Sequence, residues 1–244
     1  MPAAVRYSVR QELIQLIEQG RDTVLTAPLY RDGVLVAPAS GTVTIYDDSN
    51  TAIVSAASVT ITGSIAEYTV LGSLTSGAGL GVGWRVVWSL TIVGQPSAVV
   101  IPQEAALVRY RLRPVISDAD IIRRIPALDY SSPVCITSET TYQDYIDEAD
   151  TEVQQWLTSL GRRPWLIASP SALRQVWLYA AVSLIFEAVH DHRPNDGYLE
   201  SVRRYREMYE RAKSEARVTF DWDEDGDGDT SDRTALKPGI IWMC

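Results

Sequence analysis

The spacing of apolar residues changes along the chain and divides it into a short N-terminal segment, a strand-rich half and a helical half. In the first segment, apolar residues recur at the spacing of one helix face, at Val5, Val9, Leu13, Leu16 and Ile17. Gly20 follows them, and glycine is a typical residue just beyond the end of a helix. This pattern predicts an N-terminal helix within residues 1–22.

Residues 23–114 contain about seven short apolar runs that are separated by turn signals such as Asp32-Gly33. In residues 84–93, one set of alternate positions holds Trp84, Val86, Trp88, Leu90 and Ile92, and the other holds Arg85, Val87, Ser89 and Thr91. This period of two predicts a half-buried strand whose tryptophans lie in a core. The runs together predict an antiparallel β-sandwich that is immunoglobulin-like in outline. The chain lacks the Cys–Trp–Cys pattern, so a true immunoglobulin domain is not supported.

Residues 115–219 have a helical period and predict a small all-α bundle. Ser117 is a typical N-cap for a first short helix, and Ser169-Pro170 is a typical start of a later one. The helix from that start to residue 189 is apolar nearly all round, which favours a central position. The last helix carries a narrow seam that includes Tyr205 and Tyr209, and this seam is suited to lie along a partner. The predicted fold class is α+β with two domains.

Composition and charge exclude several classes of protein. The chain has 46% hydrophobic and 22% charged residues, as ordinary globular proteins do. Its formal net charge of −9 argues against a general nucleic-acid-binding protein, which would carry a basic stripe. Cys135 and Cys244 suggest no disulfide framework. Residues 1–20 do not have the pattern of a signal peptide, and the apolar run at 176–186 is too short to span a bilayer, so we expect no membrane association.

The most distinctive motif is the acidic sequence FDWDEDGDGDTSD at residues 220–232, which begins the expected C-terminal segment 220–244. When it is aligned with the twelve-residue EF-hand loop, Gly226 falls at the position of the sharp turn. The carboxylates that fall at ligand positions are Asp221, Asp223, Asp225, Asp227, Asp229 and Asp232. Calcium prefers six or more hard oxygen ligands. The motif therefore predicts a site for one Ca²⁺, and the alternative is a solvated acidic turn.

Two features separate this motif from a calcium sensor. Asp232 stands where a longer glutamate normally chelates the ion through both oxygens. No second helix is predicted after the loop, because residues 234–244 read TALKPGIIWMC. A sensor opens a pair of helices when it binds the ion. We therefore expect at most a structural ion and no calcium switch.

The sequence has no recognised catalytic motif, and we expect that the protein is not an enzyme. It contains no P-loop, no HExxH and no nucleophile elbow. His190 and His192 lie two residues apart, so they do not share a helix face. Glu187 is the one carboxylate that stands alone in an apolar run. An enzyme that uses these residues is an alternative, and it would need a deep pocket around residues 186–193.

The helical half resembles the head-to-tail adaptor (connector) proteins of tailed bacteriophages over about residues 115–232. The resemblance begins with the helix-opening ISDAD at 116–120 and continues with an amphipathic helix that ends in GRRP at 161–164. It continues with an alanine-rich buried helix at 173–189 and a Tyr- and Arg-rich helix at 198–217 that runs into the Asp/Gly loop. The strand-rich half departs from the minimal family pattern and would be an added domain.

The resemblance implies a structural virion protein located in the neck of the particle and assembled in the host bacterial cytoplasm. Such a protein forms a homo-oligomeric, dodecameric ring between the portal protein and the tail completion or neck proteins. DNA passes through its lumen without sequence recognition, and an acidic lumen suits this passage because it repels phosphates. The added β domain would decorate the outside of the ring.

The C-terminal residues form an apolar segment that is expected to bind a partner. Ile240, Ile241, Trp242 and Met243 follow the hinge-like Pro238-Gly239. Exposed apolar segments of this kind often dock on another protein, and the alternative is packing on their own domain. A calcium-binding adhesion or interaction module with a β-sandwich is the alternative function, because it would also combine strands with an aspartate loop.

Overall fold

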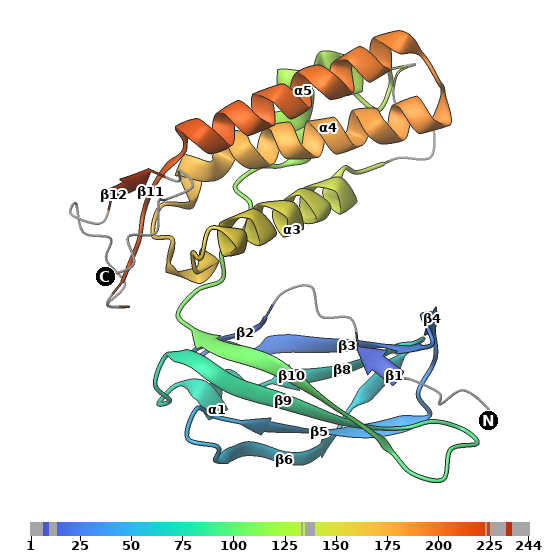
Figure 1. Cartoon of the computed structure of the whole chain (residues 1–244), viewed down its shortest axis with the longest axis vertical. Helices are drawn as coiled ribbons and strands as arrows, with labels where there is room; N and C mark the ends of the chain where they lie inside the picture. Colours follow the sequence, from blue (N-terminus) through green and yellow to red (C-terminus); the bar gives the residue numbers. More distant parts are fainter. Residues whose placement is uncertain are drawn as a thin grey trace. The chain divides into compact units, whose positions relative to one another are not determined.

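The structure is a computed structural model that describes residues 7–9, 14–132, 134, 140–222, 224 and the backbone of 233–235. The chain divides into two compact units, Met1–Arg111 and Leu112–Cys244 (Figure 1). The first unit contains two β-sheets that enclose a core, and the second contains a helical bundle. The predicted α+β class, with a β-sandwich followed by helices, is confirmed. The division falls three residues before Pro114, where the sequence pattern placed it.

The two sheets of the first unit have the strand orders β1-β3-β8-β7 and β2-β10-β9-β5-β6. The strands of the first sheet are β1 (Tyr7–Val9), β3 (Thr23–Arg31), β7 (Thr60–Thr62) and β8 (Ile65–Val70), and the short β4 (Val34–Leu35) pairs with β3. The strands of the second sheet are β2 (Gln15–Glu18), β5 (Ser40–Tyr46), β6 (Ala52–Ser58), β9 (Gly81–Thr91) and β10 (Val99–Val108). A single short helix, α1 (Gly72–Thr75), connects β8 to β9.

This topology is that of an immunoglobulin-type sandwich. If β1 and β2 are lettered A and A′ and the long strands follow in chain order, the two sheets read A-B-E-D and A′-G-F-C-C′. The unit is not purely antiparallel, because β2 pairs with β10 in parallel. The first strand is thus split between the two sheets, and each half forms an edge strand, β1 beside β3 and β2 beside β10.

The predicted N-terminal helix is wrong, because the described parts of residues 1–22 form β1 and β2. Ile17 is fully buried in the sandwich core, and Glu18 is 5% exposed and accepts a hydrogen bond from the Arg111 backbone N–H at 2.9 Å. Gln19 N–H donates to the Val108 carbonyl at 2.8 Å, which extends the pairing along β10. Pairing to sheet edges therefore overrides the helical spacing of a few apolar residues.

The core of the β unit follows the predicted alternation along β9. Trp84 and Trp88 are buried, while Arg85 between them is exposed. The indole N–H of Trp88 donates to the side-chain oxygen of Gln103 on β10 at 2.6 Å, so a buried polar group is satisfied inside the core. The two tryptophans are therefore core residues, as the period of two predicted.

The described part of the second unit contains four α-helices, as the sequence pattern predicted. They are α2 (Asp118–Arg124), α3 (Gln143–Ser159), α4 (Arg174–His192) and α5 (Asp196–Glu215). Short 3₁₀ turns connect them, at η1 (Pro126–Leu128), η2 (Pro164–Leu166) and η3 (Pro170–Leu173). After α5, the short strands β11 (Arg217–Thr219) and β12 (Arg233–Ala235) pair with each other, and this pairing was not predicted.

The ends of these helices follow capping rules that the sequence shows. The carboxylate of Asp120 accepts hydrogen bonds from the backbone N–H and the hydroxyl of Ser117, both at 3.1 Å, at the start of α2. Gly161 ends α3 with φ of +69°, and the N–H of Arg162 bonds back to the Leu157 carbonyl at 3.0 Å. This is a Schellman motif, in which glycine accepts the left-handed backbone without strain.

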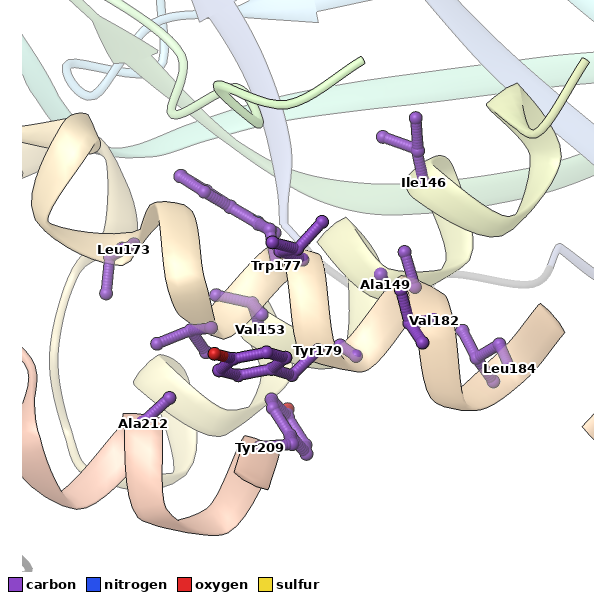
Figure 2. Close-up of a cluster of buried hydrophobic side chains, with 14 of the residues drawn as sticks. Ile146, Ala149, Val153, Leu173, Trp177, Tyr179, Val182, Leu184, Tyr209 and Ala212 are labelled. Carbon is purple, nitrogen blue, oxygen red and sulfur yellow. The ribbon is translucent and has the colours of Figure 1, made fainter. Parts of the chain in front are cut away.

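Helix α4 is enclosed by the rest of the helical unit. Its residues from Val176 to Phe186 are all buried, and α3 and α5 pack along it. Figure 2 shows the side chains that meet there, including Val153 from α3, Val182 from α4 and Ala212 from α5. The segment Pro170–His192 is long and apolar enough to cross a membrane, but 72% of its most apolar window is buried inside the structure. A core helix of a globular unit has the same properties.

The placement of β2 can be tested through its most buried side chain. Replacing Ile17 with Ala should lower the free energy of unfolding by about 2–4 kcal/mol, because it leaves a cavity in the sandwich core. The measurement is urea-induced unfolding of the full chain. Val24→Ala is the matched control, since Val24 is 54% exposed and its truncation should cost less than about 0.5 kcal/mol. Equal effects of the two substitutions would contradict this placement.

Candidate partner-binding site

The start of the acidic motif is held against the helical unit by hydrogen bonds and ring contacts. Thr219 N–H donates to the Ser169 hydroxyl at 2.9 Å, and Asp221 N–H donates to the Leu166 carbonyl at 2.7 Å. The buried ring of Phe220 stacks on Trp222 with 4.8 Å between ring centroids. The guanidinium of Arg162 lies 5.6 Å from the Phe220 ring centroid. Backbone pairing and ring contacts therefore hold the start of the acidic segment on the η2–η3 region.

The predicted calcium site falls mostly outside the described residues. Asp221 is described and half-buried, whereas the other proposed ligands are not: Asp223, Asp225, Asp227, Asp229 and Asp232. Among the described residues, no cluster of three or more His, Cys, Asp or Glu side chains could hold a metal ion. The calcium site thus stays a prediction, which titration calorimetry with Ca²⁺ would test.

The two tyrosines that were expected to bind a partner pack against other residues of the helical unit. Tyr209 is 4% exposed, so the expectation that it lies on an exposed partner surface is wrong. Tyr205 is half-buried, and its ring stacks on Phe186 of α4 with 5.5 Å between centroids. The seam of α5 thus packs along α4 of the same chain, because α4 presents apolar side chains on every face.

Glu187 is paired and is not an isolated carboxylate. The guanidinium of Arg206 on α5 contacts Glu187 on α4 at 3.1 Å and Glu152 on α3 at 3.0 Å. One arginine thereby connects three helices. All three side chains are partly exposed, so the network contributes modestly to stability and mainly fixes how the helices lie together.

The two histidines lie at the end of α4, which continues through His192. The Nδ1 atom of His190 lies 3.2 Å from the Asn195 carbonyl oxygen and faces the turn before α5. Asn195 caps α5 by accepting a hydrogen bond from Gly197 N–H at 2.8 Å. Since both histidines lie within the helix and are two residues apart, they do not converge on one ligand, and the geometry of His190 fits a role in closing the turn.

Asp150 on α3 is a titratable group that the sequence reading missed. Its carboxylate accepts hydrogen bonds from the indole N–H of Trp177 at 3.0 Å and from the side-chain amide of Gln154 at 2.6 Å. The pKa of the Asp150 carboxyl is raised to about 6, mainly by partial burial and to a smaller extent by the nearby Asp147 carboxylate, while the two hydrogen bonds oppose the rise. Asp150 lies on the same face of α3 as the apolar residues. Its burial could not be predicted from the sequence, because it results from the packing of Trp177 against it.

The charges of the helical unit are unevenly distributed. Helix α3 contains five acidic residues and no basic residue, and Asp144, Asp147 and Glu148 form an exposed stripe on one face. Within the described part of the chain, none of these three forms a salt bridge. On α5, the exposed Arg203 and Arg204 also form no salt bridge with any described residue. The unit thus carries an acidic stripe on α3 and two exposed arginines on α5, of which Arg204 lies 5.9 Å from the ring centroid of Tyr205.

A groove of about 330 Å³ lies between the start of α4 and the end of α5. The residues along its walls are Ala172, Gln175, Tyr179, Met208, Ala212 and Ala216. Figure 2 shows the Tyr179 ring on the side of α4 that faces Ala212 and Tyr209 of α5. An ion pair between Arg211 and Glu215, with 2.7 Å between Nε and Oε1, forms one polar border. The small side chains of Ala172 in η3 and of Ala212 and Ala216 at the end of α5 leave this space.

Comparison with models of known protein families found no match for this sequence, and a search of curated proteins found no match either.

The buried carboxyl of Asp150 should make stability depend on pH. The folded state holds this proton more tightly than an unfolded aspartate of pKa 3.8, so the contribution of Asp150 to stability is lost as the pH rises through about 6. Asp150→Asn removes the buried charge and keeps an acceptor for Trp177. We expect it to raise the free energy of unfolding at pH 7.5 by about 1–3 kcal/mol and to have little effect at pH 4.

Urea unfolding of the full chain at several pH values measures this effect. Asp144→Asn, at an exposed position on the same helix, is the control and should change stability by less than about 0.5 kcal/mol at either pH. If Asp150→Asn were destabilising by the same amount at both pH values, the carboxyl would not carry the raised pKa.

Proposed function

We propose that the protein is a structural virion protein, a head-to-tail adaptor that forms a ring between the portal and the tail and guides the passage of DNA. The proposal starts from the resemblance of the helical half to phage connector proteins. The observation that carries it is the helical unit itself, in which one apolar helix is enclosed by amphipathic helices and followed by a segment that is fixed to the η2–η3 region. The order of these elements agrees with the order on which the resemblance rests.

The surface charges of the helical unit support such an assembly. In a ring of identical subunits, one face of each copy contacts a different face of the next. The acidic stripe on α3 and the guanidinium groups of Arg203 and Arg204 on α5 provide opposite charges on different helices. An acidic surface that faces the lumen would also let DNA slide, because phosphates are repelled from it.

The aspartate segment lies in the helical unit and follows α5, so it does not belong to the β-sandwich. The alternative is a calcium-binding adhesion or interaction module that combines the β-sandwich with the aspartate segment, and it predicts melting that depends on calcium. In the proposed assembly the immunoglobulin-type unit is an added domain on the outside of the ring.

The direct test is negative-stain imaging of the purified protein, alone and mixed with rings of its cognate portal protein. We expect ring-shaped particles, and an added layer on the portal rings when the two proteins are mixed. Charge reversal at Arg203 and Arg204, both to Glu, should reduce ring formation, while substitution of both by Lys should not. Particles no larger than one subunit in both samples would contradict the proposal.

The C-terminal residues should contribute to these contacts. Deletion of residues 237–244 removes Ile240, Ile241, Trp242 and Met243 and should weaken ring or portal binding, because an apolar docking segment is lost. The deletion lies beyond β12, so the monomer should stay folded, with the circular dichroism spectrum of the full chain. Unchanged co-sedimentation with the portal would contradict this role.

A further inference from the structure

The pairing of β12 with β11 fixes the position and direction of the last described residues of the chain. Ala235 lies opposite Arg217, Thr234 opposite Val218 and Arg233 opposite Thr219. The strands are antiparallel, so β12 is directed from its position opposite Thr219 toward Arg217 and the end of α5. The next residue in that direction on α5 is Ala216, which lines the groove between α4 and α5. The last described residue of the chain is therefore beside one end of this groove.

Length and composition fit the residues that follow to the groove. From Ala216 to Met208 the groove follows α5 over eight residues, or about 12 Å at 1.5 Å per helical residue. Residues 236–239 span about 13 Å when extended, so residues 240–243 can lie anywhere along the groove. These residues are Ile240, Ile241, Trp242 and Met243, the most apolar run in the tail.

The walls of the groove suit an apolar peptide better than a polar ligand. Alanine, methionine and tyrosine side chains form most of it, and the charged pair Arg211–Glu215 at its border is already satisfied internally. Methionine adapts its shape to an apolar partner, and small residues let a backbone approach the helices closely. The polar residues that line the groove are Gln175 and the Arg211–Glu215 pair, and a site for a small polar ligand needs several convergent polar groups that are not already paired with each other.

We propose that residues 240–243 occupy this groove of their own helical unit, as an extended apolar peptide that continues from β12 past Ala216. We choose a segment of the same chain as the occupant because β12 ends close to the groove. The segment that follows β12 therefore has a higher effective concentration at the groove than any segment of another molecule. The inference concerns the free subunit and does not depend on the proposed function. It gives the apolar tail a binding site that is available before any partner is present.

Disulfide trapping tests this placement, and Cys244 provides one thiol next to Met243. In a Cys135→Ser background, Gln175→Cys places the second thiol on the groove wall at an exposed position. Ser214→Cys is the matched control, because Ser214 is exposed near the end of α5 but does not line the groove. We expect mild oxidation at low protein concentration to form an intrachain disulfide at least fivefold faster with Cys at 175 than with Cys at 214.

A third variant distinguishes specific docking from proximity. Adding Trp242→Ser to the Gln175→Cys protein should lower its rate of disulfide formation to that of the Ser214→Cys control. Non-reducing electrophoresis separates the intrachain product from a disulfide-linked dimer, and peptide mass spectrometry identifies the linked cysteines. Equal rates at the two positions, or a predominance of dimers formed through the tail of a second copy, would overturn the proposal.

Discussion

The organisation of the helical unit depends on one constraint, which is that α4 is apolar on every face and has to be enclosed. Each large apolar side chain that is fully buried contributes about 1.5–3 kcal/mol, so exposure of any one face of this helix would be costly. Helices α3 and α5 cover it along its length. The tyrosine seam of α5 is used for this purpose, which explains why Tyr209 is buried in the subunit.

Polar contacts then fix how the covering helices lie on α4. Arg206 on α5 connects α3, α4 and α5 through Glu152 and Glu187. Asp150 on α3 accepts a hydrogen bond from the indole N–H of the buried Trp177 on α4. The groove lies where this enclosure ends, because the alanines of η3 and of the end of α5 do not fill the space beside Tyr179 and Met208. The same constraint thus produces both the core of the unit and the surface to which its own tail is proposed to bind.

Most of the fold could be predicted from the sequence, and the exceptions have physical reasons. The helices of the second half are specified by local signals, such as the Ser117 cap and Gly161, which act whatever the tertiary context. The N-terminal helix was wrongly predicted because Leu16 and Ile17 fit a helical spacing, whereas their backbone pairs with β10, which is distant in sequence. The pairing of β11 with β12 involves only three residues on each strand, too few to give a periodic signal.

The candidate site was less predictable than the fold. Composition alone revealed the aspartate motif and the apolar tail, but the burial of Tyr209, the pairing of Glu187 and the groove depend on which helix faces meet. Burial of Asp150 similarly depends on its contact with Trp177, which lies on another helix. These properties depend on how the helices pack together, and the sequence pattern of a single helix does not predict that packing.

The central claim is that this chain is a ring-forming subunit that joins a portal to a tail. Native mass spectrometry of the full-length protein, co-purified with its cognate portal protein, tests it most directly because it counts the copies of each chain in one particle. The account predicts a single dominant complex in which a dodecamer of this chain is bound to the portal ring. A protein that stays monomeric and leaves the portal free, at concentrations well above those found in infected cells, would contradict it.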